Sequence, residues 1–482
     1  TILVNGARYG QGQSLNGVSI NLEFISANPT GPLHLGHTRW AAVGDALGRV
    51  LSAAGAKVTR EFYINDRGVQ MDKFGASVMA AAQGRPIPED GYHGSYIADL
   101  AAEIVANDAS IIELSDDDQL IAFREAAYTL QLKQQQDVLA GFNTVFDVWY
   151  SERSLHDSGA VERGFEQLRA HGKVFEQDGA VWLRTTDFDD DKDRVMVRSN
   201  GELTYFASDT AYYVDKRNRG FDRCIYLLGA DHHGYVNRLR AVAACAGDDP
   251  DNNIEILIGQ LVKMMKGGEE VRLSKRAGNI ITLEDLVDEV GVDAARYSLI
   301  RYPVDSPLTL DLDLLIKRTN ENPVYYIQYA HARVCSVFRQ LREKGLEHDV
   351  ARGRASLARL TEPHELALLA QESGLVVQAL AARGEQPFLL GQLFRQARIG
   401  LGRTPQVGGE ADGGAAGLLR LQPDGAGALG IEAVGEAVGV GIHAHVAQHQ
   451  QRRALGHALA IAHLHLAHRA AFGMLHLDPV EV

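Results

Sequence analysis

Alternating apolar and polar positions near the start of the chain predict a β-strand that leads into a helix and a second strand. Apolar residues occupy every second position across residues 19–25, and the pattern ends in a loop rich in proline and glycine at residues 28–32. Apolar residues then recur at helical spacing over residues 40–54, and residues 58–64 again form a strand-like run. This order predicts a β-α-β unit.

Helical periodicity dominates the next part of the chain, about residues 71–139, which we interpret as part of an insertion extending to about residue 195. Two short apolar runs, residues 224–228 and 254–262, have the length and the flanking turns of buried parallel strands. Thr282 and Asp285 then form a capping-box pattern that predicts the start of a helix, and Asp293 is a candidate cap for the following helix. The pattern therefore predicts an α/β domain followed by helices.

The composition changes beyond about residue 371. Lysine, asparagine and tyrosine no longer occur, glycine is frequent over residues 384–441, and 8 of the 18 histidines fall within residues 443–476. Such a sequence buries little apolar surface, which makes disorder one explanation, and a reading-frame shift in a GC-rich gene is another. The sequence leaves both explanations open.

Composition and charge narrow the class of protein. A chain of 482 residues with 45% apolar residues exceeds the ~250–300 residues at which single cores stop growing, so we expect several domains. No apolar run approaches the ~18 residues of a membrane span, and no signal-like start is present, which favours a cytoplasmic protein without membrane contact. The three cysteines show no C-x-x-C spacing, so we expect no structural metal. The net charge of −14 argues against non-specific binding of nucleic acid but permits a local basic face.

Two loops carry candidate chemistry. His34-Leu35-Gly36-His37 lies between the first strand and its helix, where exposed backbone N–H groups favour phosphate and the imidazoles could donate to ATP. The basic loop at residues 272–279 contains Lys275, whose ammonium could stabilise a departing pyrophosphate. Taken singly, each loop is more often ordinary surface or core sequence, and only their occurrence together favours the functional interpretation. No G-x-G-x-x-G or Walker motif is present.

Together these loops resemble the HIGH and KMSKS signatures of the class I aminoacyl-tRNA synthetases. Longer segments at residues 23–37, 205–212 and 322–326 resemble the arginyl-tRNA synthetases in particular, and the resemblance extends over about residues 1–371. Arg272 and Leu273 stand where the general KMSKS pattern has lysine and methionine, and Ala230 stands where many relatives have a glutamine. The fold implied is a Rossmann-like parallel-sheet catalytic domain with a helical insertion, followed by an α-helical bundle.

The resemblance also implies the site. The catalytic residues implied are His34, His37 and Lys275, and the ATP-binding residues are Gly36, Gly229, Asp231, His233, Ser274 and Lys275. The arginine-binding residues implied are Glu23, Asn28, Tyr205 and Asp209, with Asn28 at the α-amino group. Carboxylates suit this role because the planar guanidinium fork pairs with them in a bidentate manner.

The activity implied is that of an arginine--tRNA ligase, which forms arginyl-adenylate from L-arginine and ATP with Mg²⁺ and transfers arginine to the 3′-terminal adenosine of tRNA-Arg. We expect a monomer in which residues 1–18 are a remnant of an N-terminal tRNA-binding domain and residues 19–300 form the catalytic domain. Residues 301–371 would begin an anticodon-binding helical domain, and residues 372–482 would form the atypical tail. The alternative is a truncated, non-catalytic fragment that binds ATP or tRNA without completing aminoacylation.

Overall fold

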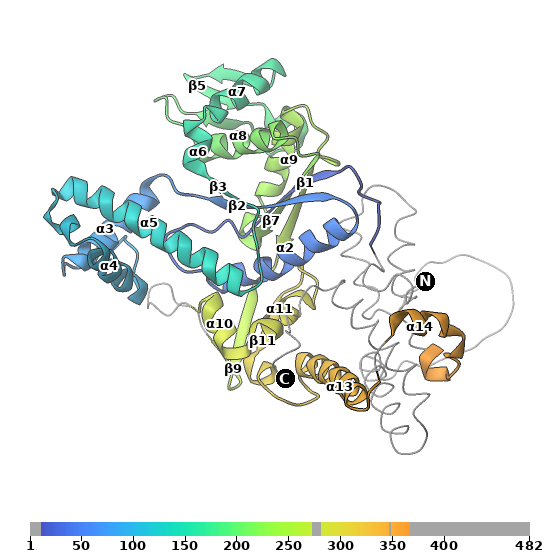
Figure 1. Cartoon of the computed structure of the whole chain (residues 1–482). Coiled ribbons are helices and arrows are strands. Elements are labelled where there is room, and N and C mark those ends of the chain that lie inside the picture. The colour runs from blue at the N-terminus through green and yellow to red at the C-terminus, as the bar shows by residue number, and fades with distance from the viewer. Residues whose placement is uncertain (1–10, 272–280, 347–348, 367–482) are drawn as a thin grey trace, which may run out of the picture. The chain divides into compact units, whose positions relative to one another are not determined.

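The structure is a computed structural model that describes residues 11–271, 281–346 and 349–366 (Figure 1). The chain divides into two compact units. The described residues of the larger unit are 11–271 and 281–325, and those of the smaller unit are 326–346 and 349–366. The expected tail at residues 372–482 lies outside the described residues, as do Ser274 and Lys275.

A five-stranded parallel sheet forms the centre of the larger unit. Its strands lie in the order β3 (Val148–Ser151), β2 (Lys57–Ile64), β1 (Ser19–Phe24), β7 (Arg223–Gly229) and β8 (Ile254–Gly259). The predicted parallel α/β fold is confirmed, although the sequence analysis did not identify β3. The strand order reverses between β1 and β7, and ligands usually bind outside the carboxyl ends of the strands at such a point.

Helix α2 (Leu35–Ala53) packs closely against the central strand β1. Gly44 permits this approach, because a Cβ atom at that position would lie 2.3 Å from the ring of Phe24. A second close contact occurs at Gly259, where a Cβ atom would lie 2.4 Å from the Trp40 ring. Because Gly44 and Gly259 have no side chains, α2 packs directly on the sheet. The close packing lies next to the loop that leads into α2 at Leu35.

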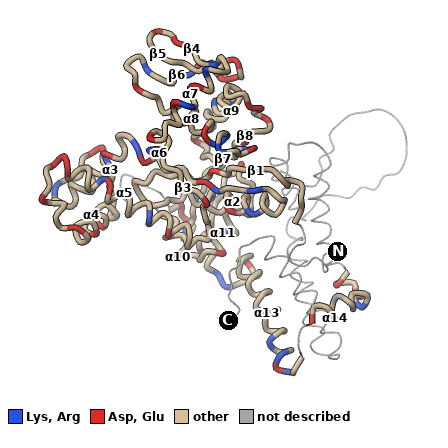
Figure 2. The backbone as a smooth tube through the Cα atoms, turned by 45° about the horizontal axis from the view of Figure 1, so that its top comes forward, with Lys and Arg blue, Asp and Glu red and all other residues tan. Residues whose placement is uncertain are grey.

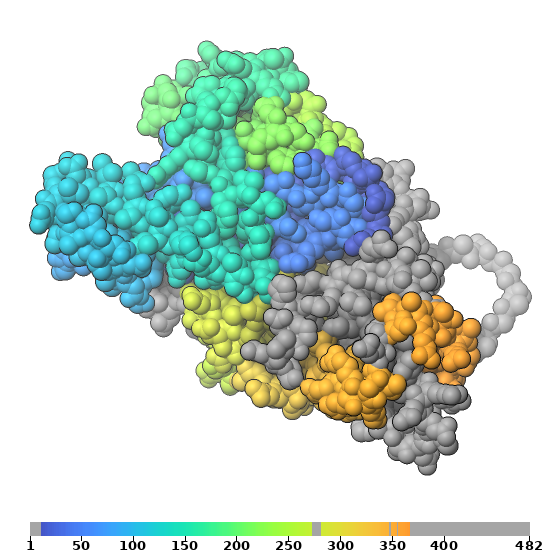
Figure 3. Space-filling model, viewed as in Figure 1, coloured from blue at the N-terminus to red at the C-terminus, as the bar shows by residue number. Residues whose placement is uncertain are grey.

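Two separate segments are inserted into the sheet. Between β2 and β3, the helices α3 (Val69–Ala82), α4 (Ser95–Asn107) and α5 (Asp116–Gly141), with the short η2 (Ala109–Glu113), bury a core of their own that includes Phe74, Ile97 and Phe123. In the space-filling view these helices form the protruding lobe at the left (Figure 3). Acidic residues are frequent along this lobe and include the first turn of α5 (Figure 2).

The second inserted segment lies between β3 and the helix that precedes β7. It comprises α6 (Glu152–Asp157), α7 (Ala160–Ala170), η3 (Thr185–Phe188) and an antiparallel sheet of β4 (Val174–Gln177), β5 (Ala180–Leu183) and β6 (Arg194–Val197). Helix α8 (Tyr205–Asn218) then leads to β7, and η4 (Ala230–His232) and α9 (Tyr235–Cys245) follow that strand. The return of the chain to the main sheet at β3 therefore divides the region that we expected to be one insertion.

The apolar run at residues 254–262 supplies two strands rather than one. After β8 the chain enters β9 (Val262–Lys266), which pairs with β10 (Glu269–Glu270) and β11 (Leu308–Asp311) in a separate small sheet. The Thr282 capping box is confirmed at the start of α10 (Leu283–Val290). The cap of α11 (Val292–Ile300) is Gly291, so Asp293 lies in the first turn and the prediction that it caps the helix was wrong.

Helical structure follows β11, as expected. The helices are α12 (Leu312–Leu315), α13 (Pro323–Glu343), α14 (Val350–Ala355) and the short η5 (Leu357–Arg359). Within the described ranges, no helix combines the length and apolar character needed to cross a membrane.

Candidate functional site

The chain leaves β1 through a strained turn at the carboxyl edge of the sheet. Ile25 and Ser26 have φ angles of 70° and 46°, a left-handed conformation that is rare for residues other than glycine and especially for a β-branched one. The Ser26 hydroxyl donates to Glu23 Oε1 at 2.9 Å and accepts from the Tyr63 backbone N–H at 3.2 Å. Backbone strain of this kind concentrates at functional sites. Here the left-handed turn places the Ser26 hydroxyl where it holds the carboxylate of Glu23.

Glu23 is also paired with a lysine that the sequence analysis missed. Lys216 is completely buried, and its Nζ lies 2.5 Å from Glu23 Oε2, 4.4 Å from the Tyr212 ring centroid and 3.9 Å from the Tyr226 ring centroid. The two aromatic faces and the carboxylate together stabilise a buried ammonium. The charge of Glu23 is therefore balanced inside the protein before any ligand binds.

Asp209 lies near Glu23 but has too little positive charge around it. It follows Tyr205 by one turn of α8, is partly buried, and has its pKa raised to about 7 by burial and then by the negative charges of Glu152 and Glu23. Arg238 opposes this shift without cancelling it. The arrangement would favour a cationic ligand, which would restore the ionised form of Asp209.

Glu152 is a second acidic residue of this region that the sequence analysis did not identify. It begins α6 and is 7% exposed, and burial raises its pKa. The predicted pocket residue Tyr205 is 73% exposed at the start of α8. Asn28 is also exposed, and its side-chain amide donates to Gln70 Oε1 at 2.7 Å.

The two histidines of the first signature form a reciprocal cap on α2. His34 Nδ1 accepts from the Gly36 N–H at 3.1 Å, and His37 Nδ1 accepts from the His34 N–H at 3.3 Å. The rings lie 3.9 Å apart between centroids. Because both Nδ1 atoms act as acceptors, the neutral tautomer carries its proton on Nε2, which makes Nε2 the atom that can donate to a phosphate.

Gly36 is required within this cap. A Cβ atom at Gly36 would lie 2.9 Å from His34 Cε1, so a larger residue would displace the ring. The prediction that unpaired N–H groups of this loop would bind phosphate was wrong, because the Leu35 N–H donates to the Ile281 carbonyl, the Gly36 N–H to His34 Nδ1 and the His37 N–H to the His34 carbonyl. The positive end of the α2 dipole and the two imidazoles are the groups that favour an anion here.

The chain that follows the second signature is joined to the first signature. Leu35 N–H donates to the Ile281 carbonyl at 3.2 Å, and Leu283 N–H donates to the Leu33 carbonyl at 2.8 Å. Ser274 and Lys275 lie outside the described residues. The residues that directly follow their loop nevertheless pair with the backbone on both sides of His34.

The third predicted segment lies at the end of the neighbouring strand. β7 pairs with β1 so that Tyr226 is opposite Glu23, and β7 ends at Gly229. A Cβ atom at Gly229 would lie 2.5 Å from Asp231 Oδ1, so glycine leaves room for the Asp231 side chain. Asp231 and His233 are both exposed. The structure thus brings the ends of β1 and β7 together at the point where the strand order reverses.

The described residues of this region offer neither a cluster of metal ligands nor an ionised thiol. Among the described residues, no three histidine, cysteine, aspartate or glutamate side chains gather in an arrangement that could hold a metal ion. Burial raises the pKa of Cys224 to about 11 and that of Cys245 to about 12, so both thiols are neutral near pH 7.

Comparison with known proteins identifies the family to which this chain belongs. Residues 1–301 match the family described as "tRNA synthetases class I (R), catalytic domain". The arginine--tRNA ligase of Frankia alni is 55% identical over 369 residues, which cover 77% of this chain and 66% of the relative. That of Renibacterium salmoninarum is 55% identical over 383 residues, covering 79% and 68% of the two chains. The chain therefore spans about two thirds of the length of these relatives.

Solved structures agree with this assignment. A Campylobacter jejuni protein described as an arginyl-tRNA synthetase superposes with a TM-score of 0.79 at 29% identity, covering 98% of this chain and 95% of that one. The arginyl-tRNA synthetase of Thermus thermophilus has a TM-score of 0.60 at 18% identity, which shows a shared fold. From its sequence and its fold, the chain belongs to the class I aminoacyl-tRNA synthetase family, in the group specific for arginine.

Proposed function

We propose that the chain acts as an arginine--tRNA ligase, with L-arginine, ATP and tRNA-Arg as its substrates. The observation that carries the proposal is the partly buried Asp209 carboxyl, whose neighbours Glu152 and Glu23 leave it short of positive charge. A guanidinium supplies that charge and pairs with a carboxylate through two parallel hydrogen bonds. Asn28 would bind the α-amino end, and Tyr205 would cover the side chain from the start of α8.

The first step joins arginine to AMP. An oxygen of the arginine carboxylate attacks the α-phosphorus of ATP, a P–O bond forms, and the bond to the leaving pyrophosphate breaks. The substrate supplies the nucleophile, so the protein acts by positioning and by stabilising charge. His34 and His37 would donate from Nε2 to the phosphate oxygens, and Lys275 would follow the departing pyrophosphate.

The nucleotide would lie between the ends of β1 and β7. Gly36 and Gly229 leave space beside these strands, Asp231 can accept from ribose hydroxyls, and His233 would lie near the adenosine with Ser274 at the phosphates. Mg²⁺ would accompany ATP. The described residues form no protein cage for it, and Mg²⁺ bound largely through phosphate oxygens and water requires none.

In the second step, a ribose hydroxyl of the 3′-terminal adenosine of tRNA attacks the arginyl carbonyl. The new ester bond forms and AMP leaves with the electrons of the mixed anhydride bond. The helices from α13 onward would contact tRNA.

The proposal is tested by ATP–pyrophosphate exchange with each amino acid, in the presence and absence of tRNA. Exchange should require arginine and should fall in Asp209→Ala by at least about 30-fold, because truncation of one partner of a buried charge pair costs roughly 2 kcal/mol or more. Glu202→Gln is the matched control, since Glu202 is exposed just before α8 and pairs with Arg198. Equal activity of Asp209→Ala and Glu202→Gln would exclude the proposed pocket.

A further inference from the structure

Each helix of the inserted lobe contacts the loop at residues 28–31, which leads from β1 to the first signature. Gln70 at the start of α3 accepts from the Asn28 side chain at 2.7 Å. The Tyr96 hydroxyl in α4 donates to the Thr30 carbonyl at 3.1 Å. These contacts join three segments that are far apart in the chain to one short stretch of backbone.

The strongest of these contacts comes from Gln135 in α5. Its side chain is 1% exposed, and its Nε2 donates to the Asn28 carbonyl at 3.0 Å and to the Gly31 carbonyl at 2.8 Å. A primary amide has two N–H donors, so one side chain satisfies the carbonyls at both ends of the loop. Without it, these two backbone carbonyls would lose the hydrogen bonds that Gln135 donates.

The same loop is fixed on its other side. Pro29 and Pro32 restrict its backbone, and the Leu33 carbonyl accepts from the Leu283 N–H at 2.8 Å. His34 follows one residue after Leu33. The position of His34 and of the start of α2 therefore depends on a loop held between α5 and the start of α10.

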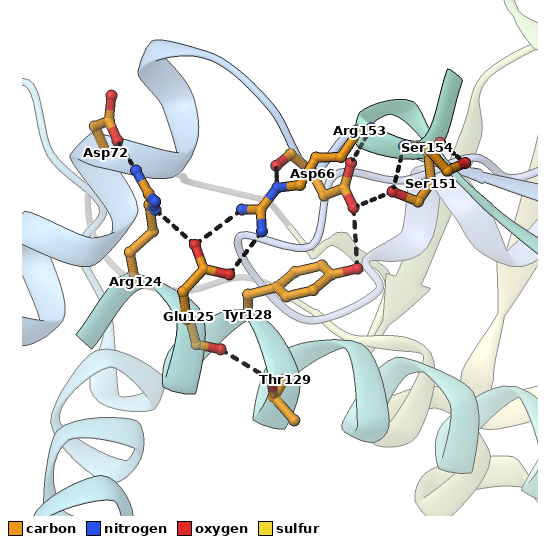
Figure 4. A network of polar contacts seen from close by, with 9 residues as sticks. All are labelled: Asp66, Asp72, Arg124, Glu125, Tyr128, Thr129, Ser151, Arg153 and Ser154. Carbon is orange, nitrogen blue, oxygen red and sulfur yellow. Dashed lines mark hydrogen bonds and ion pairs between the residues drawn. The ribbon is translucent and has the colours of Figure 1, made fainter. Parts of the chain in front are cut away.

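Helix α5 is itself joined to the start of α6, beside Glu152, by a polar network (Figure 4). Arg153, the residue after Glu152, donates to both oxygens of Glu125 at 2.6 and 3.1 Å. The Tyr128 hydroxyl and the Arg153 backbone N–H both donate to the Asp66 carboxylate, at 3.1 and 3.0 Å. Residues 125 and 135 lie about 15 Å apart along α5, at 1.5 Å per residue, so one helix connects the loop at residues 28–31 with the start of α6.

We propose that Gln135 and Tyr96 are positioning residues for amino-acid activation, through which the inserted lobe sets the geometry of the loop that carries Asn28 and leads into His34. This inference rests on the proposed function of that loop in binding arginine and ATP. The lobe then contributes to the rate of adenylate formation and not only to the stability of the fold.

The chain offers a closely matched control. Gln131 lies one turn before Gln135 on α5, is completely buried, and donates to Gln134 Oε1 at 2.6 Å within its own helix. Among the described residues, the Oε1 atoms of Gln131 and Gln135 both lack a hydrogen-bond partner. Replacing either glutamine by methionine removes a buried amide and keeps a side chain of similar volume. Only Gln135→Met also removes the hydrogen bonds to the loop at residues 28–31.

Two readouts test the proposal, namely the kinetics of ATP–pyrophosphate exchange and hydrogen–deuterium exchange of the peptide at residues 27–38. Gln135→Met should lower kcat about 10- to 100-fold, the range that small misplacements of reacting groups produce, and should speed amide exchange in that peptide. Tyr96→Phe, which removes one hydrogen bond, should lower kcat about fivefold. Gln131→Met should stay within about twofold of the unmodified chain.

The two readouts separate this inference from the proposed function. If the unmodified chain shows no arginine-dependent exchange, the proposed function fails, while the amide exchange of residues 27–38 still reports whether Gln135 holds the loop. Unchanged kcat in both Gln135→Met and Tyr96→Phe would overturn the inference, as would an equal loss in Gln131→Met. Should Gln135→Met fail to fold, Tyr96→Phe alone decides by the same two readouts.

Discussion

The affinity for arginine should depend on pH through Asp209. Its pKa of about 7, raised by burial and by Glu152 and Glu23, means that about half of the free molecules carry a neutral Asp209 at pH 7. A bound guanidinium favours the ionised form and lowers that pKa. Under the proposed function, arginine should therefore bind the state in which Asp209 is ionised, and its binding should release the proton where Asp209 is neutral.

The magnitude follows from the pKa. The ionised fraction falls from about nine tenths at pH 8 to about one tenth at pH 6, so the apparent affinity should fall about 10-fold across this range. A shift from the ordinary value of 3.8 to about 7 corresponds to roughly 4 kcal/mol against the charged form in the free protein, a cost that the substrate's positive charge offsets. Because Asp209 has a raised pKa, its contribution to folding stability decreases as the pH rises from about 4 to about 7.

The assay is isothermal titration of arginine at several pH values, in buffers that differ in their enthalpy of ionisation. Near pH 7 about half a proton should be released for each arginine bound, and affinity should rise toward pH 8. Asp209→Asn should bind more weakly and should lose the pH dependence. Burial and the charge of Arg67 lower the pKa of the nearby His156, which moves its titration away from that of Asp209. A constant affinity between pH 6 and pH 8 would show that ionisation of Asp209 does not control arginine binding.

Two further predictions concern the packing behind the site. Lys216→Met should lower the free energy of unfolding by about 3–5 kcal/mol, because it leaves the carboxylate of Glu23 buried without its cation. Urea unfolding measures this loss, and combination with Glu23→Gln should recover part of it; equal losses in the single and double variants would contradict the pairing. Gly44→Ala should lower the free energy of unfolding by about 1–3 kcal/mol, because the new Cβ would overlap the Phe24 ring. Gly141→Ala should leave the melting temperature unchanged, because a Cβ at that position would have no neighbour within 4 Å. Equal melting temperatures for the two alanine variants would contradict the packing argument.

Local sequence patterns predicted much of the fold. The alternation over residues 19–25, the helical spacing that follows it and the Thr282 capping box depend on neighbours in sequence, and all are present in the structure. Strand β3 was missed because it has only four partly buried residues. The division of residues 254–262 into two strands was missed because an apolar run does not reveal which sheet each residue joins.

The candidate site was predicted less completely. Motif residues such as Glu23 and Asp209 could be identified from the resemblance, and the structure places both in the larger unit near the carboxyl edge of the sheet. Lys216 could not be identified, because a lysine near the end of a helix ordinarily extends into solvent. Its burial depends on Tyr212 in the preceding turn of the same helix and on Tyr226 and Glu23 from two other elements. Gln135 was missed for the same reason, since its partners lie more than a hundred residues away.

The most direct test of the account is the transfer of radiolabelled arginine to tRNA by the purified chain. With ATP, Mg²⁺ and unfractionated tRNA, the account predicts that arginine becomes acid-precipitable and that labelled lysine does not, because lysine presents a single ammonium where the pocket suits a planar fork. Transfer of another amino acid in place of arginine, or no transfer of arginine by folded protein, would contradict it.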